Sequence, residues 1–215
     1  MDFLGQLAPP ERALLLALAR RRRLSRGEFV FRVGDTRRGV YALLRGRLKF
    51  FRIAPDGREV ILWFCHPGEV FGISEVPAAK GRRVNVEACE DSEVARVADV
   101  AFNRFLDEHP AASRLCRRVM AARLGMLTNT LVNLVAEGAY ARIGKLLLHL
   151  HGSGTNGSDI AMSHQEIASM TGTNRQTVTS VLGDLRRHRA LSIKRRRIHI
   201  DNAALLDRLV HASSR

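Results

Sequence analysis

The stretch SHQEIASMTGTNRQTVTSVLGDLRR, residues 163–187, constrains the fold most strongly, because it predicts two short helices in close succession. Ser163 can cap the first helix, and Glu166 three residues later can bond back to the cap's own N–H. Thr173 and Gln176 repeat this spacing ahead of the second helix. Two capping signals only ten residues apart predict a helical hairpin.

A tight corner between the two helices is predicted at Thr171-Gly172, because glycine tolerates backbone angles that other residues resist. Ile167, Ala168, Val178 and Val181 fall where two crossing helices must touch. Ala168 is small enough to allow a close approach. The stretch therefore predicts a helix-turn-helix with an apolar inner face.

The outer face of the second helix carries polar side chains of a length that reaches base edges in a major groove. An ordinary helical hairpin would also have a polar exterior, so the charge of the chain matters. With 35 Lys+Arg against 21 Asp+Glu the net charge is +14, which favours a polyanionic partner, either nucleic acid or an acidic membrane surface. Half of this excess lies in residues 138–215. We expect base contacts from Asn174, Arg175, Gln176, Thr179 and Ser180.

Two β-type runs, 191–193 and 198–200, flank a basic turn after the hairpin and predict a wing beside the second helix. Basic side chains there suit phosphates, which strengthen binding without specifying sequence. A last helix is predicted over 202–211. We expect contacts to the DNA backbone from Ser163, His164, Gln165, Thr173, Lys194, Arg195, Arg196 and Arg197.

The region from Leu24 to Val97 has a different pattern, with short alternating or β-branched runs separated by Gly and Pro turns. Many short strands at this spacing predict an antiparallel β-barrel or jelly roll, and 55–57 (PDG) is a strong hairpin signal. A short helix is predicted over 9–19. The basic run 20–23 suits either a nucleic-acid arm or a charged surface edge, and we favour the edge.

A long helix is predicted from about residue 111 to 137, following a short helix over 100–107. An apolar stripe with spacings of 4, 3, 4 and 3 runs along it, as in a helix–helix seam. A single helix packed on the barrel is the alternative, but a regulator on a two-fold DNA site needs a two-fold axis. The seam of a parallel homodimer is therefore expected at Met120, Leu124, Leu127, Leu131 and Leu134.

Gly138 breaks the long helix and is a predicted hinge, followed by a helix over 139–151 and a loop, HGSGTNGS. The chain is thus expected to be an α+β protein. Its predicted domains are a β-roll at 1–110, a dimerisation helix at 111–137 and a winged helix-turn-helix DNA-binding domain at 138–215.

The composition indicates a cytoplasmic protein without a cofactor. Three cysteines stand far apart with no CxxC pair, so we predict neither a metal site nor a cluster, and expect inert thiols in a reducing compartment. The N-terminal apolar run is too short for a membrane span, and no membrane partner is expected. No phosphate loop or nucleophile–base motif is present, so we predict no catalytic residues and no enzyme.

In this order, the elements and several motifs resemble the cyclic-AMP receptor protein / fumarate-nitrate regulator (CRP/FNR) family of bacterial transcription factors. The motifs are Gly34, Tyr41, Gly46, PDGRE at 55–59, PGEVFG at 67–72, RRVNVEA at 82–88 and QEIASMTGTNRQTV at 165–178. The resemblance implies a cyclic-nucleotide-binding-like roll, and a homodimer that binds an inverted repeat of double-stranded DNA and contacts RNA polymerase. It also implies an effector pocket whose state reaches the DNA-binding domains through the long helices. We expect an activator.

The resemblance also assigns roles in the helix-turn-helix. Arg175 occupies the position of the family's first guanine-contacting arginine, Gln176 stands where cyclic-AMP-responsive members have Glu, and Ser180 replaces a second arginine. An amide favours adenine over a cytosine amino group. The half-site is therefore expected to depart from TGTGA at its inner positions.

The predicted effector pocket is degenerate. In cyclic-AMP-binding members the carboxylate after Phe-Gly holds the ribose, an Arg-Ser pair grips the phosphate and Thr-Ser meets the adenine. The corresponding residues here are Ile73, Arg82-Arg83 and Leu127-Thr128. Each polar ligand group left unpaired costs about 1–3 kcal/mol, so we expect independence from cyclic AMP. The pocket is assigned to Gly72, Ile73, Ser74, Glu75, Arg82, Arg83, Leu127 and Thr128.

Three alternatives stay open at this stage: a regulator that responds to a cyclic nucleotide, one that responds to haem, and a cyclic-nucleotide-binding regulatory subunit. Adjacent residues Cys65 and His66 would point to opposite faces of a strand, which argues against their joint ligation of haem iron. The N-terminus has no cysteines for the iron–sulfur cluster of the oxygen-sensing branch. The recognition helix and the wing argue against a regulatory subunit.

Overall fold

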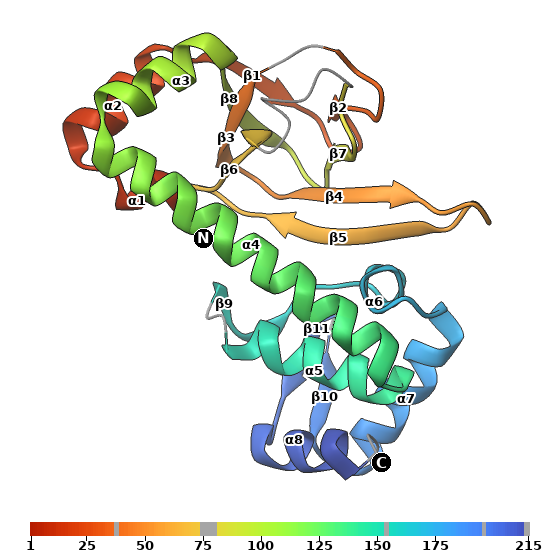
Figure 1. Cartoon of the computed structure of the whole chain (residues 1–215). Coiled ribbons are helices and arrows are strands. Elements are labelled where there is room, and N and C mark those ends of the chain that lie inside the picture. The colour runs from red at the N-terminus through yellow and green to blue at the C-terminus, as the bar shows by residue number, and fades with distance from the viewer. Residues whose placement is uncertain (37–38, 74–80, 153–154, 195–196, 213–215) are drawn as a thin grey trace. The chain divides into compact units, whose positions relative to one another are not determined.

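The computed structural model describes residues 1–36, 39–73, 81–152, 155–194 and 197–212 (Figure 1). The chain divides into two compact units. The first comprises Met1–Ile53 and Ile61–Met126, and the second comprises Ala54–Val60 and Leu127–Arg215. The three-domain division predicted from the sequence stays a prediction.

Helices open and close the first unit, and its strands lie between them along the chain. The helices are α1 (Phe3–Gln6), α2 (Pro9–Ala17), α3 (Asp99–Glu108) and α4 (Pro110–Ala136), which continues into the second unit. The strands are β1 (Arg20–Leu24), β2 (Phe29–Phe31), β3 (Val40–Arg45), β4 (Leu48–Ile53), β5 (Glu59–Cys65), β6 (Val70–Phe71), β7 (Asn85–Ala88) and β8 (Ser92–Val97), and the first two residues of β5 are counted with the second unit.

The strands form two four-stranded sheets, ordered β1-β8-β3-β6 and β2-β7-β4-β5. The pairs whose register is resolved are antiparallel. The predicted jelly roll is thus confirmed, whereas the described strands do not close into one barrel. The turn predicted at 55–57 joins β4 to β5, where the N–H of Ala54 donates to the carbonyl of Arg58 at 2.8 Å.

Period-two alternation in the first sheet separates two apolar cores, because successive strand residues face opposite sides. On β3, Val40 and Ala42 belong to a core shared with the helices, while Tyr41 and Leu43 face the space between the sheets. The helical side receives Phe3, Leu15, Phe102, Phe105, Leu115 and Val119 from α1 to α4. The roll therefore has a helix-covered outer face and an aromatic interior.

The basic run at the N-terminus forms strand β1, in which four arginines are exposed and Leu24 is buried. β1 pairs with β8, bringing Arg21 within 3.4 Å of Glu93. The preferred prediction, a charged surface edge, is confirmed, because β1 is an edge strand of its sheet. Helix α1, capped by Asp2 through the N–H of Gly5, was not predicted.

The second unit continues after α4 with helices and one small sheet. Its elements are α5 (Ala139–Gly152), β9 (Thr155–Ile160), α6 (His164–Thr171), α7 (Arg175–Arg187), β10 (Leu191–Lys194), β11 (Arg197–Ile200) and α8 (Ala203–Ala212). Strands β10, β11 and β9 form an antiparallel sheet in that order. The prediction that the HGSGTNGS segment is all loop is wrong, since its end belongs to β9, which pairs with β11.

Candidate DNA-contacting surface and roll interior

Helix α6 begins with the predicted capping box. The hydroxyl of Ser163 accepts from the N–H of Glu166 at 3.2 Å, and the carboxylate of Glu166 accepts from the N–H of Ser163 at 2.8 Å. The orphan N–H groups of a helix start are thereby satisfied. The entry to the helix-turn-helix therefore has a defined geometry.

The predicted corner also forms, but the second helix starts one residue later than expected. Gly172 adopts left-handed angles, φ 61° and ψ 39°, at the C-cap of α6. The predicted capping box of Thr173 and Gln176 is wrong, because Asn174 is the N-cap of α7 and its Oδ1 accepts from the N–H of Thr177 at 2.8 Å. An amide oxygen suits an N-cap better than the threonine before it.

The inner face of the helix-turn-helix is as predicted. Ile167, Ala168 and Val178 are fully buried and Val181 is 7% exposed. Arg142 of α5 ties this hairpin to the end of α4, since its guanidinium donates to the carbonyls of Thr171 at 2.8 Å and Glu137 at 2.5 Å. One side of α7 is therefore covered by apolar packing.

The opposite side of α7 presents the five residues predicted to contact bases, and all five are exposed. They differ in how far their polar groups are already engaged. Within the described part of the chain, the side chains of Arg175, Gln176 and Ser180 make no hydrogen bond or ion pair. Asn174 uses its oxygen as the N-cap, and the Thr179 hydroxyl lies 2.9 Å from the Arg175 carbonyl. Three of the five side chains are therefore available for a partner.

Of the residues predicted to contact the DNA backbone, Ser163, His164 and Gln165 lie at the start of α6, Thr173 lies in the turn between α6 and α7, and Lys194 and Arg197 lie on β10 and β11. Ser163 and Gln165 are exposed, whereas His164 and Thr173 are half-buried. Lys194 and Arg197 are exposed and directly paired across β10 and β11. The predicted residues Arg195 and Arg196 lie outside the described residues.

A carboxylate on the inner side of α7 anchors it to α5. Asp184 accepts from the hydroxyl of Tyr140 at 2.9 Å and from Arg187 at 2.8 Å. Hydrogen bonds from Arg187 and then Tyr140 lower the pKa of Asp184. Partial burial and the bond to Asp184 raise the pKa of Tyr140 to about 12. The hydrogen bond from Tyr140 to Asp184 is therefore kept throughout the neutral pH range.

In the roll, Arg82 is buried and already occupied by the protein. It is 4% exposed, its Nη2 donates to the carbonyl of Gly39 at 2.7 Å, and its guanidinium lies 4.2 Å from the ring centre of Phe31. A Cβ on Gly72 would come within 3.0 Å of Arg82 Nη1, so these two predicted pocket residues lie side by side. Arg83, in contrast, is exposed.

Ile73 packs against the core shared with the helices, and its place in a pocket stays a prediction. The predicted pocket residues Ser74 and Glu75 lie outside the described residues. Leu127 and Thr128 belong to the second unit, and their place in a pocket stays a prediction. Of the predicted set, the structure thus brings together Gly72 and Arg82.

Aromatic side chains fill the interior beside Arg82, which the sequence reasoning did not anticipate. Tyr41 stacks on Phe71 with ring centres 5.3 Å apart, and Phe50 stacks on Trp63 at 4.4 Å. Phe50 also meets the edge of Phe71 at 5.2 Å. Stacked and edge-to-face pairs of this kind stabilise buried aromatic rings beyond the burial of their area. The aromatic residues that the sequence places in β3, β4, β5 and β6 are the signal from which this interior can be predicted.

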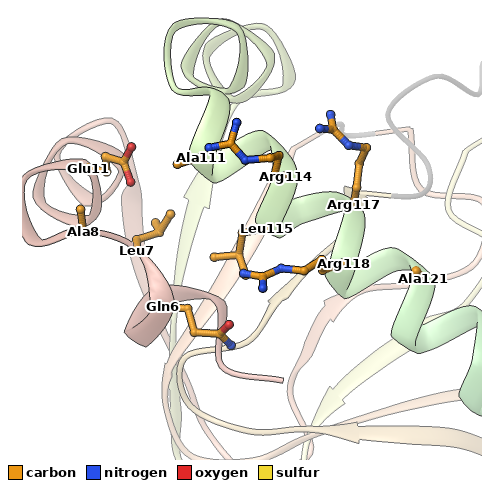
Figure 2. Close-up of a pocket in the computed structure, with 10 residues that line it drawn as sticks. All are labelled: Gln6, Leu7, Ala8, Glu11, Ala111, Arg114, Leu115, Arg117, Arg118 and Ala121. Carbon is orange, nitrogen blue, oxygen red and sulfur yellow. The ribbon is translucent and has the colours of Figure 1, made fainter.

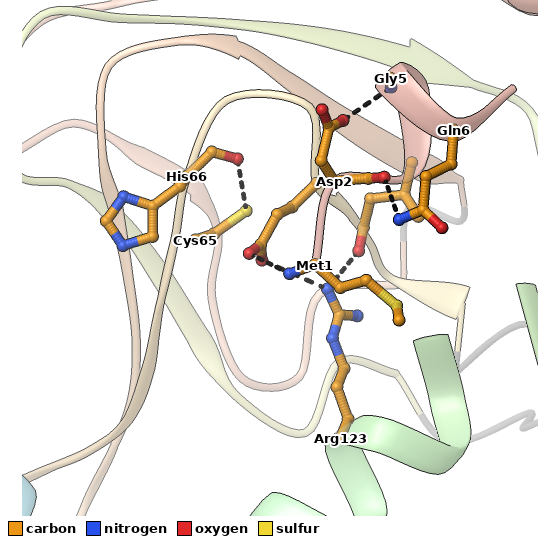
Figure 3. Close-up of polar contacts among 9 residues, drawn as sticks. Met1, Asp2, Gly5, Gln6, Cys65, His66 and Arg123 are labelled. Carbon is orange, nitrogen blue, oxygen red and sulfur yellow. Dashed lines mark hydrogen bonds and ion pairs between the residues drawn. The ribbon is translucent and has the colours of Figure 1, made fainter. Parts of the chain in front are cut away.

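A polar cluster in the first unit joins α4 to the loop before β6 (Figure 3). Arg123 donates to the carbonyl of Val70 at 2.5 Å and lies 3.8 Å from the carboxylate of Glu69. Glu69 also pairs with the amino group of Met1 at 2.5 Å. Burial, followed by the charge of Glu69, raises the pKa of the Cys65 thiol. Cys65 is therefore an unreactive core thiol, in line with the prediction.

A separate cavity of about 770 Å³ lies in the first unit between α1, α2 and the start of α4 (Figure 2). Arg114 and Arg118 extend from α4 toward α1 and α2, where Glu11 and Gln6 lie. Leu7 and Leu115 form its apolar part. This cavity includes none of the predicted pocket residues. Among the described residues no group of His, Cys, Asp and Glu has the arrangement of a metal site.

The second half of α4 exposes apolar side chains over a broad face. Leu124 is 67%, Leu131 62% and Val135 82% exposed, and none of the described residues beyond Val119 on this helix is fully buried. Over one 18-residue window the mean hydropathy is 1.3, so length and composition alone would also permit a membrane span. An exposed apolar face of this size marks an interaction surface.

Comparisons with known proteins agree with this architecture. Residues 21–109 match the cyclic nucleotide-binding domain family, and residues 141–209 match the Crp-like helix-turn-helix domain family. A CRP-like cAMP-activated global transcriptional regulator of Mycobacterium tuberculosis is 30% identical over 165 residues, covering 74% of each chain. The chain belongs to the CRP/FNR family of transcription regulators.

Two further relatives extend the match to nearly the whole CRP/FNR chain. The cyclic AMP receptor protein of Thermus thermophilus is 29% identical over 203 residues, 94% of each chain. The crystal structure of a CRP-family transcriptional regulator from the same organism, 28% identical, superposes with a TM-score of 0.74 over 90% of this chain and 98% of its own. Their similarity includes both the roll and the helix-turn-helix.

Proposed function

We propose that this CRP/FNR regulator binds an inverted repeat as a homodimer, with α7 in the major groove, and that cyclic AMP is not required. One observation carries the DNA-contacting part of the proposal. Arg175, Gln176 and Ser180 project from the exposed start of α7 with no partner among the described residues, while the opposite side of the helix is buried. Exposed and unpaired polar side chains on the second helix of a helix-turn-helix are suited to hydrogen bonds with base edges in the major groove.

The roles of single residues follow from their chemistry. Arg175 can donate two hydrogen bonds to O6 and N7 of a guanine, and the amide of Gln176 favours adenine. Ser180 supplies a short donor or acceptor in place of a long cation. Lys194 and Arg197 on the wing, with Ser163 and Gln165 on α6, suit phosphates. The preferred half-site should therefore depart from TGTGA at its inner positions, with half-site centres ~34 Å apart.

Selection of binding sites from a random pool of duplexes, followed by affinity measurements at one fixed salt concentration, tests this assignment. Arg175→Ala should weaken binding by about 1–3 kcal/mol and relax preference at one base pair per half-site. Arg186→Ala is the matched control, because Arg186 is an exposed arginine in the last turn of the same helix. Recovery of an unaltered TGTGA repeat would show that the roles of Gln176 and Ser180 are wrong.

Independence from cyclic AMP is supported by the state of the roll. The buried Arg82 is bonded to the Gly39 carbonyl and lies against Phe31, so a cyclic phosphate would have to displace these contacts. No carboxylate follows Gly72, where Ile73 packs toward the helices. The relatives named as cyclic-AMP proteins favour a second candidate function, a regulator that binds cyclic AMP. The measured affinity of the protein for cyclic AMP decides between the two candidates.

The remaining parts of the proposal follow from the family and the charge. We expect the protein to act in the cytoplasm as an activator that contacts RNA polymerase. Transcription in vitro from a promoter that carries the selected operator would measure the sign of the effect. Reduced transcript with added protein would reverse the assignment from activator to repressor.

A further inference from the structure

Thr179 occupies the middle of the DNA-contacting face of α7. Arg175 and Gln176 precede it by four and three residues, so both are its neighbours on the helix surface. Its side chain is exposed. On the proposed mode of binding, Thr179 is therefore among the residues nearest to the bases.

The hydroxyl of Thr179 is nevertheless engaged within the protein. Its Oγ1 lies 2.9 Å from the carbonyl oxygen of Arg175, one turn earlier in α7. The same atom lies 2.9 Å from Nδ1 of His164, the first residue of α6. Either the hydroxyl donates to the Arg175 carbonyl and accepts from His164, or it donates to His164. In both tautomers of the histidine the single hydroxyl proton stays inside the helix-turn-helix.

The two bonds engage the only polar group of the Thr179 side chain and leave its methyl without a polar role. With Oγ1 directed toward the Arg175 carbonyl and α6, the Cγ2 methyl occupies another of the staggered positions around Cβ. A threonine methyl is one of the groups that pack against the C5-methyl of thymine in the major groove. With its hydroxyl engaged, Thr179 can therefore offer a base an apolar contact through this methyl.

We propose that Thr179 contacts a thymine through its methyl group, with its hydroxyl retained by His164 and Arg175. The proposal rests on the proposed function, because it requires α7 to lie in the major groove. It assigns one T·A pair in each half-site, beside the base pair that Arg175 contacts. Burial of one methyl against another stabilises the complex by roughly the transfer free energy of a CH₂, a factor of about four per half-site.

Replacement of thymine by deoxyuridine tests the contact, since it removes the C5-methyl and leaves every hydrogen-bonding group in place. Each thymine of the selected operator is replaced in turn, and the affinity of the full-length protein is measured by fluorescence anisotropy. We expect one symmetry-related thymine per half-site at which the replacement weakens binding about fourfold. Thymines outside the half-sites provide the baseline.

Two variants separate the methyl from the hydroxyl. Thr179→Val keeps a methyl in place and removes the hydroxyl, and we expect it to retain both specific binding and the uridine effect. Thr179→Ser keeps the hydroxyl and its two bonds but lacks the methyl, and we expect it to lose the uridine effect at that position. Because the residue is exposed, both variants should fold, and circular dichroism checks this.

Several results would overturn the proposal. A methyl contact would be excluded if replacement by deoxyuridine weakened binding at none of the thymines in the half-site. It would also be excluded if the effect of the replacement persisted in Thr179→Ser. A more than tenfold loss of specific binding in Thr179→Val would show that the hydroxyl accepts from a base amino group instead. In these cases the protein still forms a specific complex and only this inference fails, whereas the absence of any selected operator would overturn the proposed function as well.

Discussion

At the scale of single residues, the helix-turn-helix separates side chains that hold the fold from those left for a partner. Asn174 and Thr179 both look like base-contacting residues by type, yet Asn174 caps α7 and the Thr179 hydroxyl bridges to His164. Arg175, Gln176 and Ser180 keep their polar groups unpaired within the described chain. A polar residue on a recognition helix therefore has to be assigned from its contacts as well as from its type.

Gly172 should be the most sensitive single position in the turn. Its left-handed backbone, φ 61°, disfavours any side chain, and a Cβ would also lie 2.9 Å from Cδ2 of Leu134. We expect Gly172→Ala to lower the free energy of unfolding by about 1–2 kcal/mol. Urea denaturation measures this. Gly183→Ala is the control, because Gly183 lies inside α7 with no atom near its Cβ position and should gain up to about 1 kcal/mol.

The bond between Tyr140 and Asp184 should make stability depend on pH in the alkaline range. The pKa of Tyr140 is raised in the folded state from 10.0 to about 12, so its contribution is fully present below about pH 10 and is lost as the pH rises toward about 12. Tyr140→Phe removes this contribution. We expect the free energy of unfolding of the wild type to fall more steeply between these pH values than that of the variant. Parallel curves for the two proteins would contradict this.

At the scale of elements, α4 is unusual because it is long, apolar and largely uncovered beyond Val119. Helical stability in water comes mainly from packing of an apolar face, so this face suits a partner. The stripe recognised in the sequence is part of a wider face that also includes Val132 and Val135, 56% and 82% exposed. A face of this width favours a helix–helix contact between two copies.

Leu131→Glu tests the predicted seam. In a dimer, this substitution would place the two introduced carboxylates against each other near the two-fold axis. Because like charges repel in an apolar contact, we expect the protein to be a monomer. Analytical ultracentrifugation measures the mass in solution. Val100→Glu on α3 is the matched control, because Val100 is 82% exposed and lies outside α4, and this variant should stay dimeric. A dimer that survives Leu131→Glu would exclude this helix as the seam.

At the scale of the whole molecule, the question is whether a ligand in the roll alters DNA binding. Coupling of this kind is a free energy that links two sites and is reciprocal. In the first unit Arg82 and the aromatic residues around it already satisfy one another. The net charge of +14 favours electrostatic attraction to DNA whatever the state of the roll.

Cyclic AMP should therefore bind weakly, with a Kd on the order of 100 μM or worse, because two of its polar groups would lack partners. Calorimetric titration with cyclic AMP and cyclic GMP gives the affinity, and gel shifts with and without each nucleotide give the coupling. Micromolar binding with a tenfold gain in DNA affinity, about 1.4 kcal/mol of coupling, would overturn the expectation. Tight binding without such a gain would contradict only the argument about the pocket.

The sequence by itself determined the elements whose signals lie within a few residues. The capping box of Ser163 and Glu166, the left-handed turn at Gly172 and the hairpin at 55–57 all depend on local backbone geometry, and each forms as predicted. The spacing of apolar residues likewise indicated the roll, the long helix and the wing. Period-two spacing is typical of strands and heptad spacing of helix–helix contacts, and both can be read from the sequence.

Only the tertiary structure decided contacts between residues far apart in the chain. β9 has the composition of a loop but pairs with β11, and Arg82 meets the carbonyl of Gly39, 43 residues away. The hydroxyl of Thr179 is held by His164 from another helix. A side chain's partners at such separations depend on how elements pack, and packing is a property of the whole unit that no local pattern contains.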